Sequence, residues 1–148
     1  MKRLRAVIGA AALAVVGAGG VLVTASAADV MVYKSPTCGC CSAWVDHLKA
    51  NGFKVAVKDV DDLNAIKQSH GISRELASCH TATVDGYVIE GHVPASDIQR
   101  LLAERPKVAG LAVPGMPMGS PGMEGPTKER YDVVSFDKNG RKEVFSRH

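Results

Sequence analysis

The sequence predicts a mixed α/β fold, and its first half carries the pattern that indicates it. A short apolar run rich in β-branched residues, at 30–33, has the composition of a buried strand. One face of the helix that should follow carries four residues of buried type, Cys41, Trp44, Val45 and Leu48. The alternating run at 53–57 then indicates a second strand. A strand, a helix and a strand in this order form a right-handed crossover, which places the turn before the helix at the carboxyl end of the first strand.

The next elements extend this unit. An aspartate caps a second helix, expected at 61–70. Two further strands, at 81–84 and 87–90, are joined by an Asp-Gly pair that is typical of a hairpin turn. A capping box at 96–99 begins a third helix. The order β-α-β-α-β-β-α, with cysteines between the first strand and the first helix, is that of a thioredoxin-like sandwich.

The last third of the chain departs from this pattern. The run at 105–130 has no period and holds five prolines, five glycines and three methionines. A structureless segment of this length is functional or disordered in most compact domains. Two alternating runs around Asn139-Gly140 then predict a C-terminal hairpin within 131–148. The sequence therefore predicts an added Pro/Gly/Met-rich loop and a closing hairpin.

The first 28 residues have the order of a secretory signal peptide. Three basic residues precede an apolar run of small residues, and an A-x-A site follows it at 25–27. The alternative is an uncleaved membrane anchor, since about 20 apolar residues can span a bilayer. We expect cleavage, which leaves one mature domain at 29–148, exported to a bacterial periplasm and free of the membrane.

Removal of the signal peptide changes the charge of the protein. It contains three of the 18 Lys and Arg residues and none of the 15 Asp and Glu residues. The mature chain therefore carries equal numbers of both kinds and is formally neutral. No basic patch remains to indicate a nucleic-acid partner.

The cysteines are the main functional signal. Cys38, Cys40 and Cys41 lie within four positions at the predicted start of a helix, and Cys79 is the only other cysteine. A helix N-terminus favours the thiolate, which is the form that attacks disulfides and binds metals. A Cys38–Cys41 disulfide is feasible but leaves Cys40 without a partner, so two structural disulfides are disfavoured. The trio indicates a soft-metal site, a redox site, or both.

The position of Cys79 favours a metal. It precedes the strand at 81–84, where a thioredoxin-like fold brings a loop against the cysteine turn, so we expect it to supply a fourth sulfur. Thioredoxins have a cis-proline before that strand, whereas this chain has Ser78-Cys79-His80. Thiolates with few hard ligands nearby suit Cu(I) first and Zn(II) second.

Other candidate ligands are weaker. Three thioethers lie in the aperiodic run: Met116, Met118 and Met123. Methionine usually packs in a core, but this run has no helix or strand period to support that role, and thioethers bind Cu(I). His80 is a candidate ligand or supporting group because it adjoins Cys79, and His92 at a strand end is a lesser one. We expect His47 and His70 to be solvated helix residues.

Three segments resemble a known family, the CopG-like proteins. They are Tyr33 to Trp44 with its C-G-C-C turn, Gly91 to Pro94, and the methionine-proline run at 112–124. The resemblance covers the whole mature chain. It implies a small exported bacterial protein of thioredoxin-like fold, associated with copper resistance, that binds copper through Cys38, Cys40, Cys41 and Cys79. It further implies a multinuclear thiolate cluster and a redox role. We also expect copper ions and other periplasmic copper-handling proteins as partners.

Three functions follow from these observations. The first is a periplasmic copper protein that holds Cu(I) and acts in copper resistance, with copper redox cycling as an extension. The second is a thiol–disulfide oxidoreductase, with Cys38 as nucleophile and Cys41 as resolving thiol. The third is a structural zinc domain, which would need zinc to fold. The softness of the ligands and the family resemblance favour the first.

Overall fold

A computed structural model describes residues 28–148 of the chain. The predicted signal peptide therefore lies outside the described residues, apart from Ala28. The described part contains seven strands and three helices: β1 (Asp29–Lys34), α1 (Gly39–Ala50), β2 (Lys54–Asp59), α2 (Leu63–Ser69), β3 (His80–Val84), β4 (Tyr87–Glu90), α3 (Ala95–Glu104), β5 (Gly110–Ala112), β6 (Asp132–Phe136) and β7 (Lys142–Arg147).

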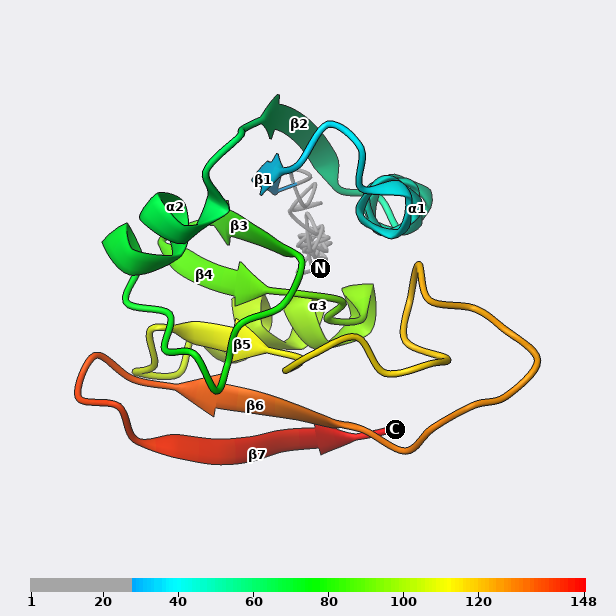
Figure 1. Ribbon diagram of the computed structural model, residues 1–148. Coiled ribbons are helices and arrows are strands. Elements are labelled where there is room, and N and C mark those ends of the chain that lie inside the picture. The colour runs from blue at the N-terminus through cyan, green and yellow to red at the C-terminus, as the bar shows by residue number, and fades with distance from the viewer. Residues whose placement is uncertain (1–27) are drawn as a thin grey trace, which may run out of the picture.

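All seven strands form one sheet in the order β2-β1-β3-β4-β5-β6-β7, which Figure 1 shows from top to bottom. Strands β1 and β2 are parallel, as the crossover through α1 requires, and β1 pairs with β3 in the antiparallel sense. The predicted order of the first seven elements is confirmed. The cysteine turn follows the carboxyl end of β1, next to the start of β3.

Helices cover both faces of the sheet. The main core joins α1 and α3 to one face, where Trp44, Leu48 and Ile98 pack with Val30 and Val32 of β1. A smaller cluster lies on the other face, beneath the segment that follows α2, and contains Ile72, Leu76, Val88, Ala112 and Phe136. Packing on the first face holds α1 against the sheet, with its first turn beside the segment that leads into β3.

The aperiodic run contains a strand that the sequence did not predict. Strand β5 pairs with β4 in parallel and with β6 in the antiparallel sense, so the C-terminal hairpin extends the main sheet. With Gly110, Leu111 and Ala112, it is too short and too weakly β-forming to show a period. Gly110 is required there, because a Cβ atom would lie 1.8 Å from the carbonyl oxygen of Val88.

The start of α3 also differs from the prediction. Pro94 is its N-cap residue and makes no side-chain cap, so the capping box expected at Ser96 is wrong. The first free N–H is satisfied from another helix, since Ala95 N donates a 3.1 Å hydrogen bond to Nε2 of His47. His47 is thus a half-buried tertiary contact, where the sequence predicted a solvated side chain.

Within residues 28–148, each of the helices is too short or too polar to cross a bilayer.

Candidate metal centre

The cysteine turn forms the N-terminus of α1. Cys38 is the N-cap residue, and its sulfur accepts a 3.3 Å hydrogen bond from Cys41 N. Cys41 is fully buried, whereas Cys38 and Cys40 are half-buried. A disulfide joins Cys38 to Cys41, and the free thiols are those of Cys40 and Cys79. The structure therefore represents an oxidised form of the turn.

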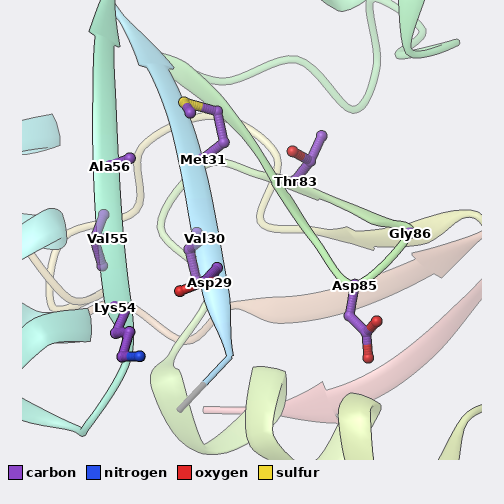
Figure 2. Close-up of a pocket in the computed structure, with 9 residues that line it drawn as sticks. All are labelled: Asp29, Val30, Met31, Lys54, Val55, Ala56, Thr83, Asp85 and Gly86. Carbon is purple, nitrogen blue, oxygen red and sulfur yellow. The ribbon is translucent and has the colours of Figure 1, made fainter. Parts of the chain in front are cut away.

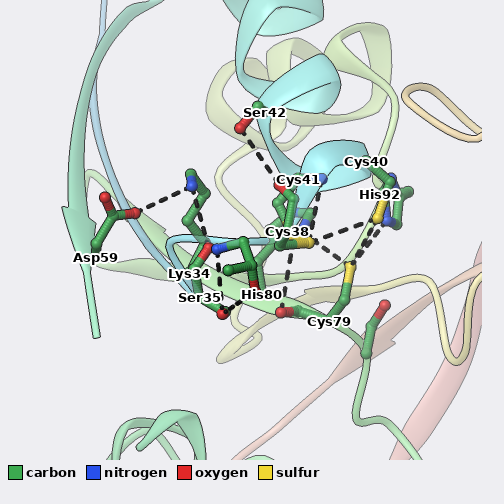
Figure 3. The surroundings of a disulfide bond; sticks show 12 residues. Lys34, Ser35, Cys38, Cys40, Cys41, Ser42, Asp59, Cys79, His80 and His92 are labelled. Carbon is green, nitrogen blue, oxygen red and sulfur yellow. Dashed lines mark hydrogen bonds and ion pairs between the residues drawn. A yellow bond between two sulfur atoms is a disulfide. The ribbon is translucent and has the colours of Figure 1, made fainter. Parts of the chain in front are cut away.

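The distant cysteine meets the other three in space. The Sγ of Cys40 lies 3.5 Å from that of Cys38 and 3.9 Å from that of Cys79, while Cys41 Sγ lies 3.8 Å from the Cys79 carbonyl oxygen. All four sulfurs lie within 4.8 Å of one another. Figure 3 shows Cys79 facing the start of α1 from the segment before β3. The predicted convergence of sulfurs is present, and a set this compact could hold a soft metal ion.

His92 provides a nitrogen donor beside this cluster. Its Nδ1 lies 2.7 Å from the carbonyl oxygen of Pro121, and its Nε2 lies 3.0 Å from Cys79 Sγ. A carbonyl can only accept, so Nδ1 carries the proton of the neutral ring and Nε2 presents a lone pair to the sulfurs. Burial lowers the pKa of His92, which keeps the ring neutral. A backbone carbonyl that fixes the far nitrogen is the usual support of a metal-binding histidine.

His80 lies deeper, in the core. It is fully buried, and its ring centroid lies 4.3 Å from that of Trp44 and 5.0 Å from that of His92. Its Nδ1 lies 3.5 Å from Cys79 Sγ, and its Nε2 has no hydrogen-bond partner in the described part of the chain. Burial, with the neighbouring His92 and Lys67, holds the pKa of His80 well below its ordinary value. Cys79, His80 and His92 thus form a second group of donors that shares one sulfur with the first.

The environment of Cys79 disfavours a free thiolate. Burial, with the nearby thiol of Cys40, raises the pKa of Cys79 to about 12. In the metal-free protein the Cys79 thiol therefore donates to Nε2 of His92. A soft cation among these sulfurs would displace the proton, because metal ligation requires the deprotonated form.

The aperiodic run reaches this site through its backbone. Figure 1 shows the segment between β5 and β6 passing close to the start of α1. A Cβ atom at Gly122 would lie 2.6 Å from the Cys40 carbonyl oxygen and 3.3 Å from His92 Nδ1. The run has an internal framework, since Gly119 N donates to the Met123 carbonyl and Met118 N to a Glu129 carboxylate oxygen. It is an ordered loop that holds His92.

The three methionines lie along this loop. The Met116 side chain is 52% exposed, and Met118 and Met123 are half-buried. The Met118 side chain lies beside Gly125 of the same loop. Copper contact by these thioethers stays a prediction.

The sequence favours His80 over His92 as a ligand, because His80 adjoins Cys79, whereas His92 has no characteristic sequence spacing from any cysteine. The signal that could have raised it is Gly91. This residue has φ +72°, and a Cβ atom there would lie 2.5 Å from Ser78 Oγ. Only glycine allows the backbone to turn this tightly beside the segment that carries Cys79.

A pocket elsewhere carries none of this chemistry. It lies at the start of β1, at the end of that strand remote from the cysteine turn (Figure 2). Its lining contains no cysteine or histidine: Asp29, Val30, Met31, Lys54, Val55, Ala56, Thr83, Asp85 and Gly86. The candidate site is therefore the sulfur cluster.

Comparisons with known proteins agree with the fold. A glutaredoxin family model matches residues 30–73, which supports the thioredoxin-like fold, and a model described as a protein of unknown function, DUF411, matches residues 76–123. No curated protein matches the chain.

Two solved structures are similar over most of the chain. One, described as copper resistance protein CopG in form 2, has 44% sequence identity and a TM-score of 0.79, and the match covers 82% of this chain and 98% of that one. The form 1 structure has 45% identity and a TM-score of 0.77, with 81% and 96% covered. At this identity and coverage, the chain belongs to the CopG-like DUF411 family of copper resistance proteins.

Proposed function

We propose that this protein binds copper in the periplasm and acts in copper resistance, with Cu(I) held by the thiolates of Cys38, Cys40, Cys41 and Cys79. The observation that carries the proposal is the meeting of four sulfurs within 4.8 Å at the N-terminus of α1. Thiolates select Cu(I) over harder cations, and the N-terminus of a helix stabilises their negative charge. The family relationship supports copper as the metal.

The sulfur set leaves room for more than one copper ion. Four thiolates can bridge several Cu(I) ions, because each ion is satisfied by two or three soft ligands. His92 Nε2, at 3.0 Å from Cys79 Sγ, would add a nitrogen donor at the edge of the cluster. A mixed sulfur and nitrogen set suits both copper oxidation states, which supports redox cycling of copper as part of the function.

An anaerobic Cu(I) titration of the reduced protein against a chromogenic chelator tests the proposal. We expect replacement of Cys38, Cys40 and Cys41 by serine to weaken Cu(I) binding by more than about 100-fold. Loss of a group that only supports a ligand lowers metal affinity by at most about that factor. Ser42→Ala is the matched control, since Ser42 lies on the exposed side of the same helical turn. Equal binding by the triple variant and the wild type would show that the proposal is wrong.

The methionines belong to the proposal as secondary ligands. Met116 is exposed, and thioethers bind Cu(I) without losing a proton, which supports a role in receiving copper. Leucine at Met116, Met118 and Met123 should lower Cu(I) affinity and preserve the fold. Met31→Leu is the control, because Met31 is also exposed but lies on β1 away from the loop. Unchanged affinity in the triple leucine variant would remove the thioethers from the site.

One observation favours a second function, thiol–disulfide exchange. The Cys38–Cys41 disulfide is at the N-terminus of α1, as in an oxidoreductase, and the glutaredoxin model matches this region. Against it, residues 28–148 contain no cis peptide bond, and the segment before β3 carries Cys79 where thioredoxins have a cis-proline. An insulin-reduction assay on metal-free protein decides between them. Turnover that depends on Cys38 and Cys41, and is indifferent to Cys40, would favour exchange.

A further inference from the structure

We infer that the buried ion pair of Lys67 and Glu90 is a positioning device that holds Cys79 against the cysteine turn. The inference rests on the proposed function, since it names the groups that keep the sulfur cluster assembled. Lys67 comes from α2 and Glu90 from the end of β4, and neither touches the sulfurs. Both act through the backbone and side chains on either side of Cys79.

Glu90 binds the chain on both sides of Cys79. Its Oε1 accepts a 2.6 Å hydrogen bond from Ser78 N, and its Oε2 accepts a 2.7 Å bond from the Thr81 hydroxyl. Ser78 precedes β3, so its N–H has no hydrogen bond to a neighbouring strand of the described sheet and is bound by the Glu90 side chain instead. The Cys79-His80 dipeptide is therefore clamped at both ends by one carboxylate.

Lys67 fixes the carboxylate in turn. Its Nζ lies 2.5 Å from Glu90 Oε1 and donates a 3.1 Å hydrogen bond to Thr81 Oγ1. The Glu90 side chain is 0% exposed and that of Lys67 is 10% exposed. Each side-chain polar atom of the pair has a partner in this network, so the carboxylate is held through both of its oxygens.

The cost of this arrangement argues for a role beyond stability. Burying two charges loses several kcal/mol of solvation per ion, and apolar replacements of buried ion pairs are often neutral or stabilising. A hydrophobic pair at 67 and 90 would fill the same space, yet it could not hold Ser78 N or the Thr81 hydroxyl. The ion pair, in contrast, holds the chain on both sides of Cys79 and so orients the segment that carries it.

The test separates stability from positioning with the double variant Lys67→Met/Glu90→Leu. We expect it to stay folded in the absence of urea, with its midpoint lowered only by the loss of the partners of Ser78 N and the Thr81 hydroxyl. It should bind Cu(I) at least about tenfold more weakly, as when a group that orients a metal ligand is lost. Its near-UV sulfur-to-copper absorption should change as well.

A second readout does not involve copper. With Cys38–Cys41 oxidised, the free thiols are Cys40 and Cys79, 3.9 Å apart. Phenylarsine oxide captures two close thiols by forming two As–S bonds with release of one water, and neither sulfur nor arsenic changes oxidation state. The oxidised wild type should bind one equivalent tightly, and the double variant should bind it at least about tenfold more weakly.

Thr81→Val is a second test if the double variant does not fold. It removes the hydroxyl that both Lys67 and Glu90 contact and preserves the shape of the side chain. Thr83→Val is its control, from the same face of β3 but outside the network. We expect the affinity for the arsenical to fall in Thr81→Val and to stay at the wild-type value in Thr83→Val.

The outcomes are distinguishable. If the folded Lys67→Met/Glu90→Leu variant, or Thr81→Val in its place, binds the arsenical and Cu(I) like the wild type, the ion pair is structural only and the inference is wrong. If the wild type binds the arsenical but not copper, the proposed function fails while the positioning role is still measured by the arsenical.

Discussion

Nδ1 of His92 donates a 2.7 Å hydrogen bond to the carbonyl oxygen of Pro121, and this bond joins the late loop to the sulfur cluster. The two residues are 29 positions apart in the sequence. This contact determines that Nε2 is the ring nitrogen that faces Cys79. The loop therefore orients a donor of the site, although Pro121 itself is not a ligand.

The first prediction concerns Gly122, next to that carbonyl. Its φ is +87°, and an alanine Cβ would lie 2.6 Å from the Cys40 carbonyl oxygen and 2.8 Å from Trp44 N. Gly122→Ala should therefore displace the loop, break the His92–Pro121 bond, and lower both the free energy of unfolding, by at least about 2 kcal/mol, and the Cu(I) affinity. Urea denaturation and chelator competition measure the two effects.

Gly140→Ala is the matched control. Its φ is +81°, and a Cβ atom there has nothing within 4 Å, so only backbone strain of about 1 kcal/mol is expected. Copper affinity should be unchanged in this variant. Equal effects of the two substitutions would show that Gly122 has no particular tie to the site.

The second prediction concerns His92 as a donor. His92→Ala removes the nitrogen at 3.0 Å from Cys79 Sγ and leaves all four sulfurs. We expect a fall in copper affinity of at least about tenfold and a loss of nitrogen scattering in X-ray absorption spectra of the loaded protein. His70→Ala is the control, because His70 ends α2 and takes no part in either donor group. An unchanged absorption spectrum would mean that His92 is not a ligand.

The sequence predicted the sulfur convergence because the fold itself enforces it. Once 30–57 is a right-handed crossover, the turn with Cys38 must lie at the carboxyl end of β1. The antiparallel partner β3 must then begin beside it, with Lys34 opposite His80. Cys79 follows from this register alone. The cysteine spacing and the strand pattern are local features, so the sequence alone is enough to identify them.

Other features depend on contacts between distant segments, and no local pattern records them. Strand β5 exists because β4 and β6 flank it. Its own three residues would not form a strand alone. The N-terminus of α3 is fixed by His47 from another helix, which overrides the capping box at Ser96. His92 becomes a donor only after a loop 29 residues later orients it.

The third prediction concerns the redox state of the turn. The disulfide removes Cys38 and Cys41 as thiolate ligands, so the oxidised protein should bind fewer equivalents of Cu(I) than the reduced protein. A thiol count after denaturation should find two free thiols before reduction and all four cysteines after it. Equal copper loading of both forms would mean that Cys38 and Cys41 are not needed as ligands.

The fourth prediction concerns pH and His47 in the metal-free protein. Its Nε2 accepts the Ala95 N–H, and burial lowers the pKa of His47, with the Glu124 carboxylate opposing the shift. The unfolded chain therefore takes up this proton at a higher pH than the folded one. The stability that His47 contributes is complete above the unfolded pKa of about 6.5 and is lost as pH falls from there toward the lower folded value.

His47→Gln isolates this contribution because it cannot titrate. Urea unfolding of both proteins from about pH 8 to about pH 5 should show the wild type losing stability relative to the variant as the pH falls. His80 and His92 titrate in both proteins, so they cancel in the comparison. A difference in stability that stays constant across this range would mean that protonation of His47 does not open the start of α3, and that the 3.1 Å contact with Ala95 N is not the bond that caps the helix.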